Sequence, residues 1–222
     1  MVFNYEGMRM SFGPADIGAV LQGVGSLASA AAIFGAAWLA SNTFDGWRRQ
    51  KLSERRIEQA ERILTAAYKA RRALGYVRSP LMEAHELNAA EAHLEKQDFW
   101  ATVDANRKQK LVSTQGYYNR LNAVLDERRA VEECLPMARA LFGEKVEQAL
   151  ELLNRQFRMV QIAIDSNSWE GNDREFSRSI REDLTSSSGS DRPNKMNVLI
   201  DEQVKLIEDA LVPVLRLEGG RG

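Results

Sequence analysis

Histidine and cysteine are frequent metal ligands and catalytic groups, and this 222-residue chain holds two histidines and one cysteine. The segment from His85 to Ala89 begins like the zinc-binding pattern H-E-x-x-H, but its fifth position is alanine, so the second histidine ligand is missing. His85 and His93 lie eight residues apart, two turns along one side of a helix, with glutamates nearby. A weak divalent-cation site is one interpretation of this group, and a pair of surface histidines is the other.

The single cysteine and the acidic residues around it offer little further chemistry. Cys134 has no histidine close to it in the sequence, and Glu132 and Glu133 would raise the pKa of its thiol rather than activate it, so a small buried side chain is expected. Asp126 and Glu127 could join this pair in a helical core, but a di-iron site needs Glu-x-x-His motifs, which neither histidine completes. Phosphate-binding glycine patterns and G-x-S-x-G are absent as well. We therefore expect no catalytic residue, no metal and no cofactor.

Composition indicates which elements must carry these residues. Ala, Leu, Glu and Arg abound, against 15 glycines and 5 prolines, which favours helices and predicts an all-α fold. The length suits one domain, or one domain with an appendage. A single cysteine excludes an intrachain disulfide.

An apolar stretch near the N-terminus is the most distinctive feature of the chain. No charged residue occurs from Ile17 to Phe44, and Gln22 is the one strongly polar residue before Ala40. At about 1.5 Å per residue, the helix from Ile17 to Ala40 is roughly 36 Å long, enough to cross a hydrocarbon core of about 30 Å. We predict a transmembrane helix over residues 17–44. A buried helix of a soluble bundle and a cleaved signal peptide are the alternatives.

Charges on either side of this stretch predict its orientation. Residues 1–16 have a net charge of −1, unlike the basic start of a signal peptide, whereas five Lys/Arg follow within sixteen residues of Ala40. The positive-inside rule then places a short extracytoplasmic N-terminus outside and the C-terminal side in the cytoplasm. Aromatic residues at the cytoplasmic end complete the predicted membrane interface, which consists of Trp38, Phe44, Trp47, Arg48, Arg49, Lys51, Arg55 and Arg56.

Net charge divides the rest of the chain into a basic and an acidic part. Residues 45–78 hold ten Lys/Arg and four Asp/Glu, a net charge of +6, and residues 79–222 hold 19 and 25, a net charge of −6. Juxtamembrane Lys and Arg gain about 1 kcal/mol each from anionic headgroups, so we expect a basic juxtamembrane helix over 45–78 with anionic lipid as a partner. A solvated helix face that only sets topology is the other interpretation. Nucleic acid is not expected, because no recognition motif occurs.

Apolar residues recur every three or four positions in four further segments, as in amphipathic helices. We predict helices over 43–77, over 98–141 with Asp98 as N-cap and Pro136 kinking or ending it, from Gly143 to about 164, and over 194–215. Such helices form an antiparallel bundle with long, coiled-coil-like helices, or pair between chains, so a homo-oligomer is expected. The predicted cytoplasmic domain covers 79–215, with a short helical turn at 176–184, a flexible loop near 185–194 and a tail over 216–222.

Small residues form a row along the apolar stretch. Their spacing of four residues puts them on one side of a helix, where small side chains let two helix backbones approach closely in lipid. Frequent alanine in such stretches is the alternative explanation. The predicted helix-association face consists of Ala28, Ala32, Ala36 and Ala40.

Short motifs follow the apolar stretch: FDGWRRQK at 44–51, EQAE at 58–61, YKARR at 68–72, RSP at 78–80, FG at 142–143 and VP at 212–213. With these motifs, over most of its length, the chain resembles uncharacterised bacterial proteins that have one N-terminal span and a helical cytoplasmic body. The resemblance implies a bacterial inner-membrane setting, and it transfers no catalytic residue.

These features predict a membrane-anchored helical interaction or scaffold protein without catalytic activity. Its cytoplasmic part would bind an unknown protein partner or a second copy of the chain. The alternative is a membrane-perturbing or pore-forming effector, phage-linked or part of a defence system, that acts through an oligomerising transmembrane helix.

Overall fold

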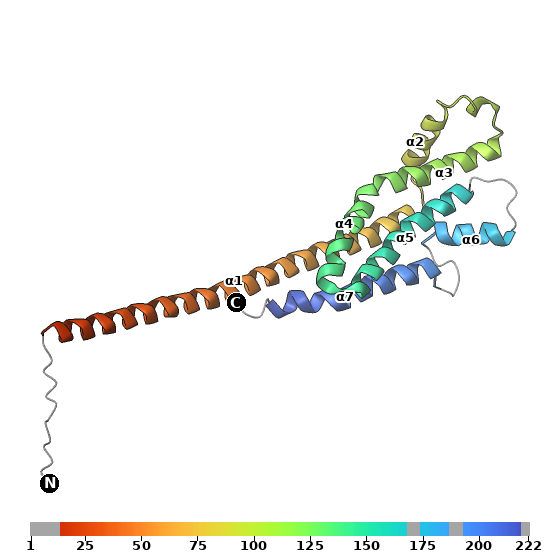
Figure 1. Ribbon diagram of the computed structural model, residues 1–222. Helices are drawn as coiled ribbons and strands as arrows, with labels where there is room; N and C mark the ends of the chain where they lie inside the picture. Colours follow the sequence, from red (N-terminus) through yellow and green to blue (C-terminus); the bar gives the residue numbers. More distant parts are fainter. Residues whose placement is uncertain (1–13, 168–173, 187–192, 219–222) are drawn as a thin grey trace, which may run out of the picture. The chain divides into compact units, whose positions relative to one another are not determined.

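The computed structural model describes residues 14–167, 174–186 and 193–218, and within these ranges the chain is all-helical, with no strand (Figure 1). The predicted all-α class is therefore confirmed for this part of the chain. Most of the predicted N-terminal segment and of the tail lies outside the described residues. The elements are α1 (Pro14–Val77), α2 (Ala84–Leu94), η1 (Trp100–Thr102), α3 (Ala105–Ala123), α4 (Leu125–Phe142), α5 (Glu144–Asn167), α6 (Arg174–Leu184) and α7 (Lys195–Glu218).

The chain divides into two compact units, and the boundary lies inside α1. The first unit ends at Glu54 and the second begins at Arg55. Among the described side chains of the first unit none is buried, whereas the second unit contains the whole hydrophobic core. The second unit is thus the part of the chain that folds around its own apolar side chains.

The C-terminal part of α1 contributes one wall of this core. Ala60, Ile63, Ala67 and Leu74 are fully buried, at the spacing of three and four residues that the sequence predicts. The helix ends at Val77, also as predicted, because a residue before proline is pushed out of the helical region. Alanine at so many buried positions allows neighbouring helices to approach this wall closely.

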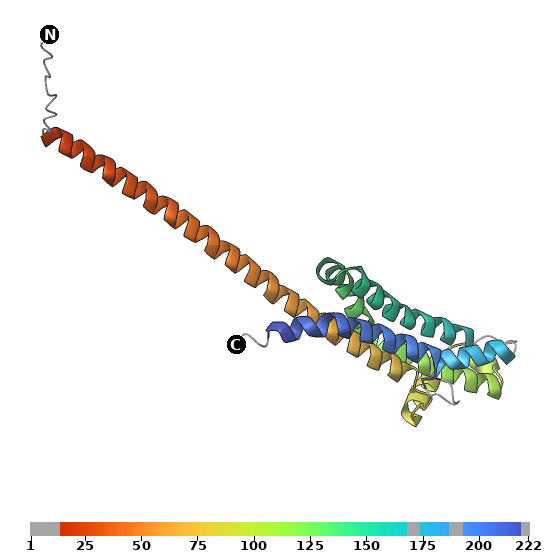
Figure 2. The ribbon, with the colours of Figure 1, turned by 90° about the horizontal axis from the view of Figure 1, so that it is seen from below.

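Helix α5 lies at the centre of the second unit. It packs against α3, α4, α6 and α7, and it runs antiparallel to α7 in both views (Figures 1 and 2). Its predicted apolar stripe is confirmed, since all six side chains are at most 3% exposed: Val146, Leu150, Leu153, Phe157, Val160 and Ile164.

The single helix predicted over 98–141 is wrong, because the structure divides this segment into η1, α3 and α4. The cap of α3 is Asp104 rather than Asp98: its carboxylate accepts a hydrogen bond from the backbone N–H of Arg107 at 3.1 Å. The break between α3 and α4 lies at Val124, whose φ of −112° and ψ of 21° leave the helical region.

This break rotates the apolar residues of α4 relative to those of α3. Leu121 before the break is buried, whereas Leu125 after it is 37% exposed. Pro136 does not end α4, which continues to Phe142. The helix ends instead at Gly143, whose φ of +91° favours glycine and turns the chain directly into α5.

Candidate functional site

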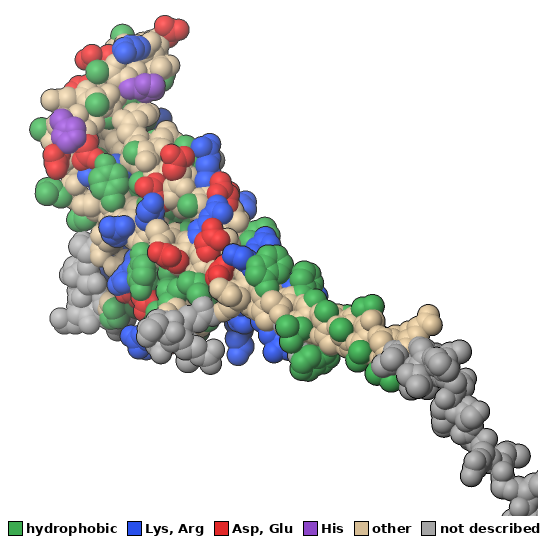
Figure 3. Space-filling view, turned by 90° about the vertical axis from the view of Figure 1, so that its left-hand side faces the viewer, with side chains coloured by type: hydrophobic (Ala, Val, Ile, Leu, Met, Phe, Trp, Pro, Cys, Tyr) green, Lys and Arg blue, Asp and Glu red, His purple; other side chains and the backbone are tan. Residues whose placement is uncertain are grey.

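Hydrophobic side chains lie at the surface of the apolar stretch of α1, and no other part of the described structure covers them (Figure 3). Every described side chain from Gln22 to Ser41 is exposed, including 72% of Leu27 and 77% of Phe34. The most apolar 18 residues have a mean hydropathy of 1.6, and none of them is buried. Among the described residues this is the one helix long and apolar enough to cross a membrane, and a signal sequence near an N-terminus has the same features.

Hydroxyl side chains within and beside this stretch bond to the helix itself. Ser26 and Ser29 each donate to the carbonyl oxygen four residues earlier at 2.9 Å, and Thr43 does the same at 2.8 Å. An unpartnered hydroxyl in apolar surroundings costs about 1–3 kcal/mol. These three side chains therefore have a hydrogen-bond partner even where water is absent.

The predicted association face carries one large side chain among its alanines. At 100° per residue, the four alanines, Ala28 to Ala40, lie on one side together with Leu39, whereas Leu27, Phe34 and Trp38 lie on the opposite side. The alanines are exposed, and no atom lies within 4 Å of the place where a Cβ on Gly25 or Gly35 would be. No other part of the described structure covers these alanines, and Leu39 is the large apolar side chain that lies among them.

Aromatic and charged side chains follow directly after the apolar stretch. The ring centroids of Phe44 and Trp47 are 5.9 Å apart with an interplanar angle of 32°, and both side chains are more than half exposed. Lys51 Nζ donates to Glu54 Oε2 at 2.6 Å, and this hydrogen bond lowers the pKa of Glu54. The other predicted interface residues of this unit are exposed as well: Trp38, Arg48 and Arg49.

The last two predicted interface residues, Arg55 and Arg56, belong to the second unit. The guanidinium carbon of Arg56 lies 5.8 Å from the centroid of the Phe142 ring at the end of α4. A cation–π contact at an exposed site contributes about 0.5–1 kcal/mol. Arg56 therefore also packs α1 against α4, a role that the charge pattern alone does not indicate, whereas Arg55 is simply exposed.

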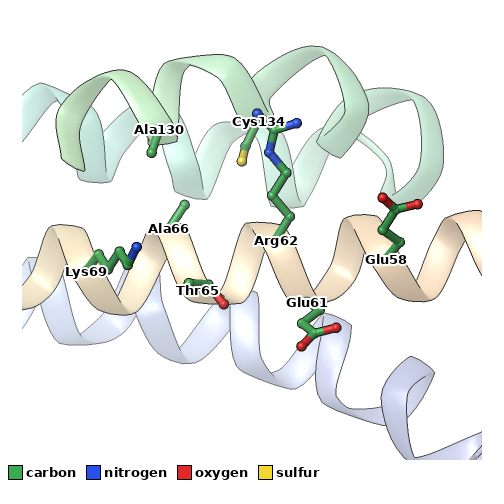
Figure 4. A pocket seen from close by; sticks show the side chains of 8 residues that line it. All are labelled: Glu58, Glu61, Arg62, Thr65, Ala66, Lys69, Ala130 and Cys134. Carbon is green, nitrogen blue, oxygen red and sulfur yellow. The ribbon is translucent and has the colours of Figure 1, made fainter. Parts of the chain in front are cut away.

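A groove of about 370 Å³ lies between α1 and α4 in the second unit (Figure 4). Its floor consists of the small side chains of Ala66, Ala130 and Cys134, and charged side chains stand along its edges, Arg62 and Lys69 among them. The groove thus combines a floor of small side chains with charged edges.

Cys134 in this groove is 2% exposed, which confirms the predicted small buried side chain. Burial raises the pKa of its thiol, an effect that Arg62 opposes and Glu133 adds to, so the neutral thiol predominates near pH 7 and is a weak nucleophile. The carboxylate of Glu133 accepts a hydrogen bond from Arg62 Nη2 at 2.7 Å. The acidic residues near Cys134 thus pair with basic side chains.

Arg78 is the largest side chain that is fully buried in the second unit. Its Nε donates to the carbonyl oxygen of Asp183 at 2.8 Å, and its Nη2 donates to that of Thr185 at 3.0 Å. The amide oxygens of Asn194 and Asn197 accept two more hydrogen bonds, at 2.8 and 2.6 Å. Burial lowers the pKa of Arg78 to about 10, so it stays charged near pH 7. This side chain therefore ties the end of α1 to the end of α6 and the start of α7.

A second buried arginine, Arg120, ties α3 to the start of α2. Its Nε and Nη2 donate to the two carboxylate oxygens of Glu86 at 2.7 and 2.6 Å, while the carbonyl oxygens of Ser79 and Leu81 accept from it at 2.8 and 2.6 Å. These hydrogen bonds lower the pKa of Glu86 to about 2. The guanidinium carbon also lies 5.3 Å from the centroid of the Tyr76 ring.

The histidines lie at the surface near this pair. His85 Nδ1 is 3.1 Å from Glu83 Oε2, and the His85 side chain is 76% exposed. The sequence likeness of His85 and Glu86 to a zinc motif has a different origin, because Glu83 and Glu86 form the capping box of α2. Within the described residues, no three His, Cys, Asp or Glu side chains are placed to hold a metal ion.

Arg120 belongs to no sequence motif, and Arg78 is part of the RSP motif at 78–80, to which the sequence attaches no role. An arginine directly after a buried helix end, and one next to the apolar Leu121, are the signals that could have identified them. Comparisons of the chain with protein-family models, with curated proteins and with solved structures found no match.

Proposed function

We propose that this chain is a membrane-anchored helical interaction or scaffold protein without catalytic activity. The uncovered apolar stretch of α1 is the observation that carries the proposal. Burying a large apolar side chain contributes about 1.5–3 kcal/mol, and the structure offers the side chains of Leu27, Phe34 and Trp38 no such burial. A bilayer supplies it, and the self-bonded hydroxyls of Ser26 and Ser29 suit that environment.

In this proposal residues 17–44 cross a bacterial inner membrane once. The five basic residues after the span favour an N-terminus outside and a cytoplasmic C-terminal domain. The exposed aromatic pair of Phe44 and Trp47 suits the headgroup level, and the basic segment 45–78 suits anionic lipid.

The helices of the second unit form an antiparallel bundle around α5 in this proposal. Support comes from the core that α1, α4, α5 and α7 share and from the antiparallel course of α5 and α7. The break at Val124 removes the single long helix on which the expected coiled-coil pairing between chains depended. The groove between α1 and α4 is one surface for a protein partner.

Membrane anchoring can be tested with matched arginine substitutions. Arginine near the centre of a span costs about 2.5–3.5 kcal/mol, so Leu27→Arg with Phe34→Arg should move the full chain from the carbonate-resistant to the soluble fraction. Leu52→Arg, at a position that is also more than half exposed but lies beyond the span, should leave it in the membrane. A reporter fused after Gly222 should be active only in the cytoplasm. Carbonate-extractable wild-type chain would refute the anchor, and periplasmic reporter activity would refute the orientation.

Self-association of the span through its alanine face is a further part of the proposal. Ala32→Leu with Ala36→Leu keeps the segment apolar but blocks close approach, and an interaction of about 1–2 kcal/mol should then weaken roughly five- to thirtyfold. Ala30→Leu with Ala37→Leu, on the other side of the helix, is the control. Equal crosslinking of both double variants in membranes would show that the alanine row reflects composition alone.

The same alanine row favours one alternative function, a membrane-perturbing or pore-forming effector. An oligomerising span would then permeabilise the membrane when the full chain is expressed. Dye entry into such cells, reduced by Ala32→Leu with Ala36→Leu but not by the control pair, would support the effector. Intact cells at the same expression level would support the scaffold.

A further inference from the structure

The outer sides of α5 and α7 carry apolar side chains that the rest of the described chain leaves uncovered. Leu152, Met159 and Ile162 on α5 and Leu199 and Leu206 on α7 are each between 39% and 54% exposed. Single exposed apolar residues are ordinary, but five on two neighbouring helices form a surface. We call these five residues the α5–α7 surface.

Helical spacing arranges the α5–α7 surface in two rows along one seam. Gln156 is buried on α5, and Leu152 lies one turn before it and Met159 one turn after it. Gln203 on α7 has the same neighbours at the same spacing, leucines four residues before it and three after it. Leu152 and Met159, like Leu199 and Leu206, lie about a quarter turn from their helix's buried stripe, in the same rotational sense, whereas Ile162 lies nearly opposite the stripe of α5. Because α5 and α7 are antiparallel neighbours, the two rows border the same seam (Figures 1 and 2).

Opposite charges accompany the two rows. Glu151, Arg155 and Arg158 flank the surface residues of α5, a net charge of +1, and Lys195, Glu202 and Asp209 flank those of α7, a net charge of −1. The side chains of Arg155, Glu202 and Asp209 are exposed, and within the described ranges none of these three forms an ion pair or a hydrogen bond. The half of the surface on α5 is therefore net basic and the half on α7 is net acidic.

We propose that a second copy of this chain covers the α5–α7 surface, with α5 of each copy against α7 of the other. A two-fold axis parallel to the helices brings the basic half of each copy against the acidic half of its partner. The other face-to-face arrangement packs α5 against α5. It places Arg155 of one copy near Arg155 of the other, and the repulsion between these two positive charges disfavours it. This dimer gives a structure to the self-association that is part of the proposed function, and to that extent it rests on the proposed function. It does not require the membrane anchor.

The dimensions of the surface suit such a dimer. Two helices of 24 residues, each about 36 Å long and roughly 10 Å wide, present about 700 Å². A stable interface buries about 800 Å² on each partner, so the rows and their flanks provide nearly the whole area. The axis also leaves residue 55 of both copies at the same end, as two chains anchored in one membrane require.

Disulfide crosslinking of the full chain tests this arrangement. In a Cys134→Ala background, Met159→Cys in one tagged copy and Leu206→Cys in a differently tagged copy should crosslink roughly tenfold more than Leu81→Cys with either of them. Leu81 is a matched control because it is apolar and exposed but lies between α1 and α2. Preferential crosslinking of Met159→Cys with itself would overturn the α5-on-α7 geometry. Yields no higher than the Leu81 control would overturn the dimer.

Charge reversal supplies the second, independent readout. Arg155→Glu alone and Glu202→Arg alone should each lower the crosslink yield roughly fivefold, and both changes in one chain should restore it because the pairs re-form with exchanged signs. Single reversals without effect, or a double variant no better than the singles, would overturn the proposal. Helical circular dichroism identifies any variant that fails to fold. The yield is measured in whichever fraction contains the chain, so failure of the anchor is distinguished from failure of the surface.

Discussion

Separating Glu86 from Arg120 should destabilise the second unit more than any surface substitution. The two side chains are 13% and 3% exposed and meet through two parallel hydrogen bonds of 2.7 and 2.6 Å. Removing one member of a buried pair leaves the other charge without a partner and costs about 3–5 kcal/mol. Arg120 also binds the carbonyl oxygens of Ser79 and Leu81, so its loss uncouples the loop after α1 from α3.

Arg120→Met and Glu86→Gln keep side-chain volume while removing charge. A unit of this size loses about 2–4 °C in Tm per kcal/mol, so either change should lower the Tm by roughly 6–20 °C. The double variant should lose less than the sum of the two, because neither charge then remains unpaired. Arg129→Met is the matched control, since Arg129 pairs with Asp126 at 3.4 Å in an exposed position and should change stability by at most about 1 kcal/mol.

The same pair predicts the response to acid. Arg120 holds the pKa of Glu86 at about 2, below the ordinary 4.5, so the folded state favours the carboxylate. Its contribution to stability is therefore complete above about pH 4.5 and is lost as the pH falls towards 2. Glu86→Gln should remove this part of the acid sensitivity. Thermal unfolding of the full chain in detergent, followed by circular dichroism, measures both effects, and an Arg120→Met variant as stable as Arg129→Met would refute the reasoning.

Three further predictions concern the rest of the chain. Arg78→Met should expose the backbone of residues 174–186 to hydrogen exchange before the rest of the second unit, because five acceptors lose their donor; uniform protection would contradict this. Deleting residues 1–47 should give a soluble, strongly helical protein, and a circular dichroism spectrum of disordered chain or strand would contradict the two-unit division. Cys134 should react with an alkylating reagent only after unfolding, since burial raises the pKa of its thiol; fast labelling of the folded chain would refute this.

The sequence predicts those features that depend on local spacing. The end of α1 before Pro80 and the stripe of α5 follow from proline geometry and helical period, and both agree with the structure. The division of the predicted helix at Val124 was not predictable, because no glycine or proline marks it. The rotation of α4 relative to α3 is stabilised only by tertiary packing. The network of Arg78 joins residues more than 100 positions apart, which no local pattern encodes.

The long separation between Arg78 and its acceptors has a consequence for synthesis. Asn197 emerges 119 residues after Arg78, which at about 5–20 residues per second corresponds to roughly 6–24 s on the ribosome. The acceptors on Glu182, Asp183 and Thr185 are made 104 to 107 residues after Arg78, and those on Asn194 and Asn197 follow last, so the full set of hydrogen bonds forms only once the start of α7 has been made. The apolar stretch, by contrast, is complete well before Arg78 is made, and any targeting by that stretch would precede assembly of the second unit. The buried arginine thus marks the final closing step of the nascent chain rather than an early nucleus.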